Sequence, residues 1–347
     1  MTDTHTIQDW QTFFDERVKG RRELVKGYLL YLEKLEKLGL PPIFELRHLS
    51  EMLGVEESTL VRIVQTTPSF YRTFSIPKRL GGKREIATPS PVLLEAQRWV
   101  LSEVLTKLEV NDCCYGFVTG RSIVDNARQH LKKQVVLKID LKDFFPSVSQ
   151  NQVMKIFLGV GYPVSVSYFL TRICCLSRSL PQGAATSPAL SNLVASRLDL
   201  GLCGYAEGKG LSYTRYADDL TFSGDYIGST EISQIKYIVS QQGFRVNEKK
   251  TRLLEGKKQK IITGVSVSNG KLALPRNSVR EIKLAAYHVL KRGYFEHSKS
   301  IGKRDPLLLE RLLGRIGFWL QIDPENATAN RLQAEIKKYI VEFDTSL

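Results

Sequence analysis

Cysteine is scarce in this chain, and its few thiols are not spaced like metal ligands. Among 347 residues there are only five cysteines. Cys113 and Cys114 are neighbours, as are Cys174 and Cys175, and Cys203 stands apart. This gives neither a C-x-x-C metal spacing nor an even disulfide framework. We therefore expect reduced, mostly buried thiols in a cytoplasmic protein.

Long apolar runs are also missing. No stretch approaches the roughly 20 apolar residues that are needed to cross a bilayer. The first residues, Met1 to Thr6, lack the basic and apolar regions of a signal peptide. These two absences predict a soluble protein with no membrane partner.

Negative charge is in the minority. The chain has 36 Asp+Glu against 50 Lys+Arg, a formal net charge of +14 at pH 7. Such an excess favours a polyanionic partner, because neutralising phosphates releases their condensed counterions. Many soluble proteins are basic without binding nucleic acid, so charge alone only favours this class. With 42% hydrophobic and 25% charged residues, the chain is typical of a globular protein, and its length predicts several packed subdomains.

The N-terminal region, residues 1–65, is predicted to be helical. Its leucines recur at helical spacing until Pro41 and Pro42, where that helix must end. Residues 46–64 predict two short helices about a turn at Gly54. Such a pair is either a DNA-reading helix-turn-helix or a helical cap packed on the main body, and we favour the cap.

Residues 66–277 mix strands with helices. A hairpin is predicted from strands at 71–77 and 83–88 around the turn Gly81-Gly82. Further strands are expected at 135–139, 211–216, 220–223 and 261–267, with helices at 89–105, 150–172, 187–206 and 230–242. Residues 278–347 are again predicted to be helical. This order of elements predicts an α+β protein built on an antiparallel sheet.

Two adjacent carboxylates, Asp218 and Asp219, stand in the predicted turn between two strands. They repel one another, but they would suit a Mg²⁺ ion that shares its oxygen ligands with substrate phosphates. Two such ions about 3.5–4 Å apart can activate a 3′-hydroxyl and stabilise a leaving pyrophosphate. The alternative is a solvated β-turn. Asp140, which ends the apolar strand at 135–139, would join them if the strands are neighbours; otherwise it caps the following turn.

Three segments carry a resemblance to a known family. Residues 140–145 (DLKDFF), 180–188 (LPQGAATSP) and 216–219 (YADD) resemble successive motifs of the reverse transcriptases, in the family's order and spacing. The similarity extends from about Tyr71 to Val267. It implies an RNA-directed DNA polymerase with a right-hand fold. Fingers and palm would occupy residues 66–277, and a helical thumb would occupy residues 278–347.

The same resemblance implies roles for individual residues. Asp140, Asp218 and Asp219 would hold two Mg²⁺ ions, which Mn²⁺ can replace. Lys250 would protonate the leaving pyrophosphate, although Lys249 is adjacent to it.

The nucleotide pocket is implied in the same way. Phe145 would reject a ribonucleotide 2′-OH, unless it is a core residue. Gln182 and Gly183 would line the pocket, since glycine lets the backbone approach closely. Lys78 and Arg84 would bind the incoming triphosphate; otherwise they belong to a solvated charged turn.

A narrower resemblance is to the retron reverse transcriptases of bacteria. Residues 126–130 (NARQH) resemble their N-A-x-x-H motif, and residues 262–264 (ITG) resemble their V-T-G element, with Ile in place of Val. We expect these segments and the basic thumb to bind RNA, the thumb contacting an RNA hairpin. A helix-surface histidine is the alternative for His130. The candidate RNA-binding residues are Asn126, His130, Thr263, Gly264, Lys291, Arg292, Arg311 and Arg315.

The retron resemblance also implies the partners. They are dNTPs and a structured non-coding RNA that serves as template and supplies a guanosine 2′-OH as primer. The product would be single-stranded DNA branched from RNA (msDNA), made in anti-phage defence with an effector protein in trans. Two alternatives stay open: another bacterial enzyme, such as a group II intron-like one, with different priming, and an RNA-binding scaffold with an idle site. Retention of the expected site residues argues against the scaffold: Asp140, Asp218, Asp219, Gln182 and Lys250.

Overall fold

The computed structural model describes residues 7–17, 21–77, 81–256, 258–300 and 305–344. The chain divides into two compact units, each assembled from separate segments. One contains Met1–Val118, Leu141–Leu202 and Ile235–Asn247, and the other contains Thr119–Asp140, Cys203–Gln234 and Glu248–Leu347. Among the described residues, no helix is both long and apolar enough to cross a membrane.

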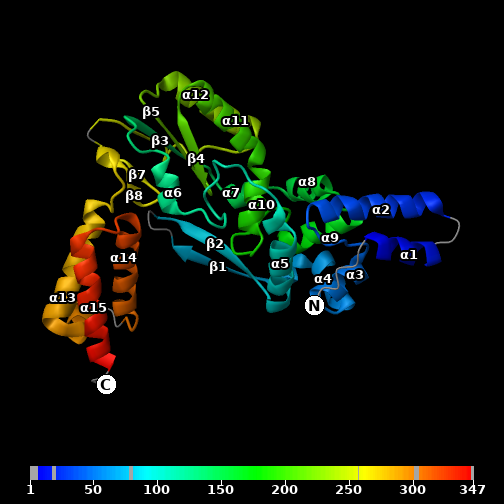
Figure 1. Ribbon diagram of the computed structural model, residues 1–347, viewed down its shortest axis with the longest axis horizontal. Helices are drawn as coiled ribbons and strands as arrows, with labels where there is room; N and C mark the ends of the chain where they lie inside the picture. The colour runs from blue at the N-terminus through cyan, green and yellow to red at the C-terminus, as the bar shows by residue number, and fades with distance from the viewer. Residues whose placement is uncertain (1–6, 18–20, 78–80, 257, 301–304, 345–347) are drawn as a thin grey trace. The chain divides into compact units, whose positions relative to one another are not determined.

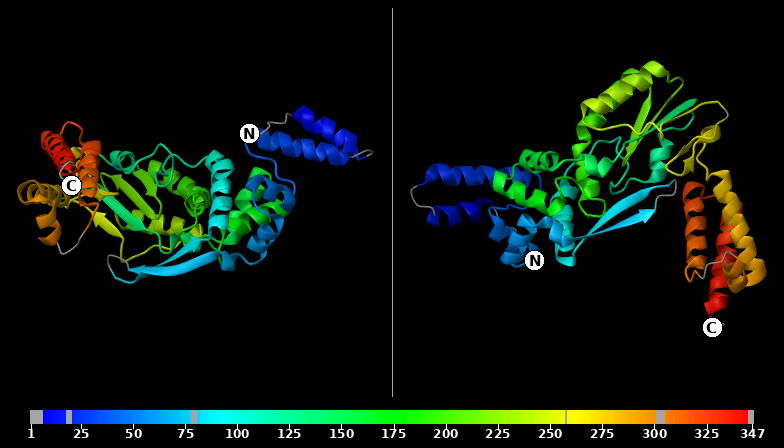
Figure 2. Two further views of the ribbon diagram at one scale, coloured as in Figure 1. Left: turned by 90° about the horizontal axis from the view of Figure 1, so that it is seen from below. Right: turned by 180° about the vertical axis from the view of Figure 1, so that it is seen from behind.

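The first unit is mainly helical and carries one hairpin (Figure 1). Helices α1 and α2 lie side by side, as Figure 2 shows, around a small aromatic and aliphatic core. Antiparallel strands β1 and β2 form the hairpin, with Tyr71 opposite Pro89. The elements of this unit are α1 (Ile7–Arg17), α2 (Arg22–Lys37), α3 (Leu46–Leu53), α4 (Glu57–Gln65), η1 (Thr67–Phe70), β1 (Tyr71–Pro77), β2 (Lys83–Pro89), α5 (Pro91–Glu103), η2 (Leu105–Lys107), α7 (Phe144–Ser147), α8 (Gln150–Val160), α9 (Val164–Cys174) and α10 (Ser187–Val194).

Helices α3 and α4 are packed on their own unit, as the cap interpretation predicts. Gly54 ends α3 with a left-handed φ of 63°, a conformation that glycine adopts at little cost. Helix α4 contacts α9, where Arg172 Nε donates to the carbonyl of Val64 at 2.6 Å and the Thr67 hydroxyl donates to the carbonyl of Arg172 at 3.4 Å.

The second unit is built on a four-stranded antiparallel sheet with the strand order β4-β5-β3-β6. The predicted antiparallel sheet is therefore confirmed. Its strands are β3 (Val135–Asp140), β4 (Ser212–Tyr216), β5 (Asp219–Gly224) and β6 (Arg252–Leu254). The unit also contains α6 (Ile123–Arg128), the small hairpin β7 (Ile261–Ile262) and β8 (Val265–Ser266), η3 (Ser268–Gly270), α13 (Arg276–Ser300), α14 (Leu308–Ile322) and α15 (Ala327–Asp344). Helices α11 (Ser196–Gly208) and α12 (Ser229–Gln241) contribute residues to both units.

Three sequence predictions of continuous elements were wrong. The helix expected over 150–172 is two helices, because Gly161 adopts a φ of 117° and Pro163 follows it. The helix expected over 187–206 is divided at Ala195, between α10 and α11. The strand expected over 261–267 folds back on itself at Thr263 and Gly264, whose φ angles of 45° and 89° suit a tight hairpin turn.

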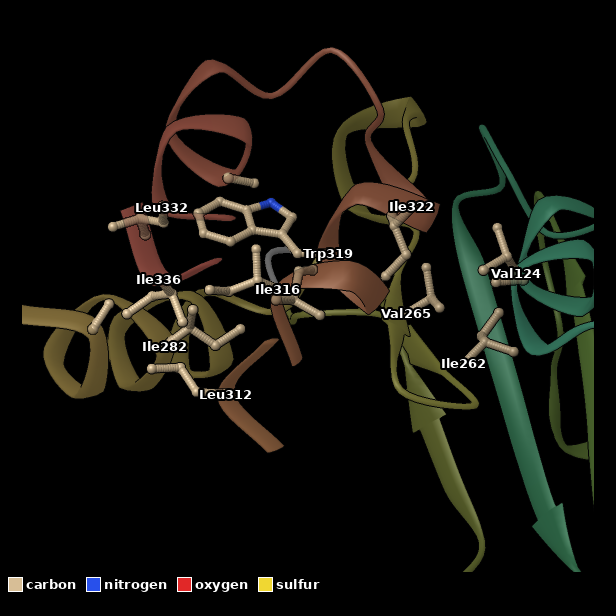
Figure 3. Packing of buried hydrophobic residues seen from close by; sticks show 14 of the residues in the cluster. Val124, Ile262, Val265, Ile282, Leu312, Ile316, Trp319, Ile322, Leu332 and Ile336 are labelled. Carbon is tan, nitrogen blue, oxygen red and sulfur yellow. The ribbon is translucent and has the colours of Figure 1, made fainter. Parts of the chain in front are cut away.

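The C-terminal helices share one apolar core with α6 and the β7–β8 hairpin. Trp319 lies near Ile316, Leu332 and Ile336, as Figure 3 shows, and only 5% of its surface is exposed. Because a buried aromatic side chain contributes a large apolar area, this tryptophan should be a main source of stability for α13–α15.

Replacing this side chain tests that expectation. Trp319→Ala should lower the free energy of unfolding by about 3–5 kcal/mol, through lost burial and the cavity it leaves. Thermal and urea unfolding followed by circular dichroism would measure the change. Val341→Ala on α15 is the matched control, because Val341 is 64% exposed. Equal effects of the two substitutions would contradict the assignment of Trp319 to a stabilising core.

Candidate active site

Three carboxylates meet at one end of the sheet in the second unit. In the antiparallel register of β3 with β5, Asp140 lies directly opposite Asp219. Asp219 of β5 also pairs with Tyr216 of β4. Asp218 occupies the turn between β4 and β5. The expectation that the strand ending at Asp140 neighbours the Asp218–Asp219 hairpin is confirmed.

The turn that carries Asp218 has an unusual backbone conformation. Ala217 adopts a φ of 56°, a left-handed conformation that is uncommon for a residue with a side chain. The Arg215 side chain, completely buried in β4, donates from its guanidinium to the carbonyl of Ala217 at 3.3 Å. Sequence reasoning missed Arg215, because a single arginine in a short strand of polar and aromatic residues gave no sign that it supports the turn.

The carboxylates raise one another's proton affinity. Burial, then the charge of Asp219, raises the pKa of Asp218 above its usual range. Burial is also the first cause that raises the pKa of Asp219, which the nearby ammonium of Lys138 partly opposes. Lys250 donates to Oδ2 of Asp140 at 2.5 Å, and this hydrogen bond raises the pKa of the lysine. The site therefore concentrates negative charge that a cation would stabilise.

This donor set fits a hard divalent cation. Asp140, Asp218 and Asp219 all supply carboxylate oxygens. Asp140 already forms an ion pair with the ammonium of Lys250, so this carboxylate is placed to contact a positive charge. In the described ranges, no group of three or more His, Cys, Asp or Glu side chains is arranged so that it could hold a metal ion. Proteins usually bind Mg²⁺ through one or two carboxylates and leave positions for water and substrate phosphates.

The predicted nucleotide-pocket residues belong to the first unit. Phe145 on α7 is half-buried, and its ring centre lies 6.2 Å from that of Phe117. Phe144 is buried and packs on Phe244 at 5.7 Å, so it is the core residue of the pair. Arg84 is exposed on β2. Lys78, also predicted to bind the triphosphate, lies outside the described residues.

Gly183 is explained by packing against the hairpin. A side-chain Cβ at this position would lie 2.5 Å from the carbonyl oxygen of Ala87, and Gly183 itself has a φ of 131°. The adjacent carbonyl of Gln182 accepts a hydrogen bond from the Ala87 amide at 2.8 Å. The loop from Gln182 thus joins β2 through its backbone, and this contact requires glycine.

A buried glutamine, which the sequence did not suggest, supports the same loop. Gln97 on α5 donates to the Tyr71 hydroxyl at 2.7 Å and to the carbonyl of Ile173 at 2.9 Å. Its side-chain oxygen accepts from the amide of Ala185 at 3.2 Å. Gln97 therefore joins α5, β1, α9 and the 180–188 loop, and leaves no part of its amide without a partner.

The N-A-x-x-H and I-T-G segments meet inside the second unit. His130 is completely buried, and its ring nitrogens lie 2.7 Å from the hydroxyls of Ser223 in β5 and Thr214 in β4. Asn126 is 1% exposed and donates to the Thr263 hydroxyl at 3.3 Å; that hydroxyl donates to the carbonyl of Ile123 at 3.0 Å. We call these residues the α6 clasp: Ile123, Asn126, His130, Thr214, Ser223 and Thr263.

The clasp corrects two sequence predictions. Asn126 and His130 were expected to contact RNA, or in the case of His130 to lie on a helix surface. Their burial leaves them no surface for either role, and their hydrogen bonds join α6 to the β7–β8 hairpin and to the sheet. Thr263 and Gly264 lie at the tip of that hairpin, where they remain candidates for RNA contact.

The four basic candidates on the C-terminal helices differ in their partners. Arg311 pairs with Asp305 and Arg315 pairs with Glu281, each at 2.8 Å. Lys291 and Arg292 are exposed on α13. Lys291 also borders a groove of about 690 Å³ between α13 and α15, together with Lys283, Tyr287 and Arg331. Exposed ion pairs are weak, so Arg311 and Arg315 can exchange their carboxylate partners for phosphates.

Comparison with known proteins places this site in a family. Residues 76–273 match the family model described as reverse transcriptase (RNA-dependent DNA polymerase). Retron Ec86 reverse transcriptase of Escherichia coli is 37% identical over 297 residues, covering 84% of this chain and 89% of that protein. From Myxococcus xanthus, retron Mx162 reverse transcriptase is 34% identical, covering 86% and 68% of the two chains, and retron Mx65 reverse transcriptase is 37% identical, covering 76% and 67%.

The chain therefore belongs to the reverse transcriptase family and is an RNA-directed DNA polymerase that uses divalent metal ions. Within this family it belongs with the retron reverse transcriptases.

The α6 clasp predicts a pH dependence of stability. Burial lowers the pKa of His130 from 6.5 to about 3, so the folded protein keeps this imidazole neutral while the unfolded chain protonates it. Stability should therefore fall as pH drops below about 6.5, by about 2 kcal/mol at pH 5 relative to neutral pH, and should level off near pH 3.

Urea unfolding at pH 5, 6 and 7.5 would measure this slope. His130→Gln should flatten it, because glutamine has no ionisable group. His48→Gln removes an imidazole from α3 and shows how much of the change is specific to position 130. An unchanged slope in His130→Gln would show that other groups cause the acid sensitivity.

Proposed function

We propose that the enzyme copies part of a structured non-coding RNA into single-stranded DNA, starting from a guanosine 2′-OH of that RNA. The observation that carries the proposal is the register that sets Asp140 opposite Asp219, with Asp218 in the adjoining turn. The mode of priming and a branched RNA–DNA product are supported by the similarity to retron reverse transcriptases. A role in anti-phage defence, with an effector protein in trans, belongs to the same proposal.

The carboxylates would act as ligands in a two-metal reaction. Two Mg²⁺ ions, which Mn²⁺ can replace, would activate the priming hydroxyl and would stabilise charge on the leaving pyrophosphate. Asp140 and Asp219 project from facing positions on two strands, so they can hold cations between them. Lys250 is held at this site by Asp140 and is the proposed donor of a proton to the pyrophosphate.

Residues of the first unit would select and hold the dNTP. Phe145 would lie under the sugar and exclude a 2′-OH by contact with its ring. Gln182 and Gly183 would border the base and sugar through a loop whose backbone β2 and Gln97 hold in place. Arg84 and Lys78 would bind the triphosphate, arginine through two parallel hydrogen bonds.

The RNA would be recognised mainly by the second unit. Exposed Lys291 and Arg292 on α13, with Arg311 and Arg315 on α14, supply positive charge for the backbone of an RNA hairpin. The tip of the β7–β8 hairpin, at Thr263 and Gly264, offers a further contact.

A direct test is to analyse the nucleic acid that copurifies with the protein. The enzyme would be expressed with its neighbouring native sequence, and the bound nucleic acid would be run on a denaturing gel after treatment with RNase, DNase or a debranching enzyme. We expect a short DNA whose mobility changes after RNase and after debranching.

The matched control is Asp219→Asn, which keeps the size of the side chain but loses its charge. It should reduce DNA synthesis at least about 100-fold, because metal stabilisation of the transition state is worth several kcal/mol. Unbranched DNA would reject priming from a 2′-OH. A scaffold that binds RNA without copying it would be favoured by two results together. The copurified nucleic acid would be RNA without DNA, and both wild type and Asp219→Asn would be inactive on a supplied template and primer.

The proposed sugar gate gives a separate prediction. Phe145→Ala should raise the ratio of ribonucleotide to deoxyribonucleotide kcat/KM by roughly 10- to 100-fold, since removing the ring removes a contact worth about 1–3 kcal/mol. Single-nucleotide primer extension would measure the ratio. Phe144→Leu is the control, because that neighbouring ring is buried and should affect stability rather than sugar choice. Unchanged discrimination in Phe145→Ala would remove this role.

A further inference from the structure

Three rows of cross-strand neighbours lie on one face of the sheet that carries the carboxylates. Residues two apart along a strand share a face, and paired residues on adjacent strands lie side by side. The first row contains Asp140, Asp219 and Tyr216. The second row contains Lys138, Thr221, Thr214 and Arg252. The third row contains Val136, Ser223, Ser212 and Leu254.

Helix α6 and His130 cover the third row and half of the second. His130 lies against Ser223 and Thr214, and Val136 belongs to the same apolar core as Val124 and Ala127 of α6. Thr214 and Thr221 are therefore buried, each 2% exposed. The other half of the second row stays open, with Lys138 half-buried and Arg252 exposed at the edge strand.

Both residues in this open half are cations. Throughout the part of the chain that the structure describes, neither Lys138 nor Arg252 forms an ion pair; the Arg252 guanidinium donates only to the neighbouring carbonyl of Thr251, at 2.8 Å. The lysine that forms an ion pair with a carboxylate of the site, Asp140, is Lys250. Lys138 and Arg252 thus remain available for an anion from outside the chain.

Their distance from the carboxylates suggests which anion. With a rise of about 3.3 Å per residue, the second row lies roughly 6–7 Å behind the first along the strands. A nucleic-acid strand whose terminal hydroxyl reacts at the carboxylates, and which leaves along this face of the sheet, brings its last backbone phosphates into this neighbourhood. Long basic side chains at that position can reach phosphate oxygens, and arginine can do so with two parallel hydrogen bonds.

We propose that Lys138 and Arg252 bind backbone phosphates of the strand that is being extended, directly behind its reacting end. This site rests on the proposed function, because it requires a primer strand at the carboxylates. The competing explanation is that Lys138 only offsets the charge of Asp219, whose pKa it lowers. The two explanations differ in what they predict for binding in the absence of metal.

Binding of a fluorescently labelled RNA template–DNA primer duplex, measured by anisotropy without divalent ions over a range of salt, would test the proposal. Lys138→Met and Arg252→Met should each raise Kd roughly five- to ten-fold at about 0.1 M salt, and each should reduce the salt slope of log Kd by about one. Lys138→Arg should keep most of the affinity.

Lys209→Met is the matched control. Lys209 is exposed beyond the opposite end of β4 from the catalytic turn, so the substitution removes the same charge and should leave Kd and the salt slope unchanged. A weakening equal to that of Lys138→Met would show a general effect of net charge and would overturn the proposed site.

A parallel titration of Mg²⁺ in DNA synthesis separates the two explanations. If Lys138→Met binds the duplex with the Kd and the salt slope of the wild type, the phosphate site is overturned. This holds whether or not the variant needs more Mg²⁺ for DNA synthesis. Should Lys138→Met fail to fold by circular dichroism, Lys138→Arg and Arg252→Met carry the same test. Failure of the proposed function is distinct, because it would show as unbranched DNA, or as RNA alone, in the nucleic acid that copurifies with the enzyme, and not as a change of Kd on this duplex.

Discussion

The antiparallel pairing of β3 with β5 sets Asp140 opposite Asp219, and the arrangement of the site depends on this register. Neighbouring side chains on a strand point to opposite faces, so a slip of one residue would turn Asp140 toward the face occupied by Leu137 and Ile139. Those two side chains are almost completely buried. The apolar face of β3 therefore fixes the position of a charged residue on its other face.

This register has an electrostatic cost, because it gathers three carboxylates in a partly desolvated place. Burial and mutual repulsion raise the pKa values of Asp218 and Asp219. Lys250 offsets part of the charge by direct contact with Asp140, and Lys138 does so from the next row of the sheet. A site that is electrostatically unfavourable alone is suited to binding cations with a substrate that brings its own phosphates.

The family motifs are held in place by residues outside them. Arg215 supports the left-handed residue of the catalytic turn, and Gln97 joins the 180–188 loop to three other elements. The retron-like segments have a comparable internal role, since Asn126 and His130 connect the β7–β8 hairpin to the sheet. A motif shared by relatives can thus mark a packing junction as well as a ligand contact.

The sequence by itself determined the parts that depend on local chemistry. A β-branched apolar run predicted the strand that became β3. Two further strands, which became β4 and β5, were predicted on either side of a turn carrying Asp218 and Asp219. Three ordered motifs were enough to indicate the family, because each is a short continuous segment. The excess of Lys and Arg over Asp and Glu likewise favoured a polyanionic partner without any knowledge of the fold.

Only the tertiary structure decided which distant segments meet. The three-residue strand β6 has too little periodicity to be recognised, yet its pairing with β3 brings Arg252 beside Lys138. The burial of His130 depends on hydroxyls 84 and 93 residues further along the chain. Such partners are chosen by packing across the whole unit, whereas periodicity and turn chemistry report only on neighbours in sequence.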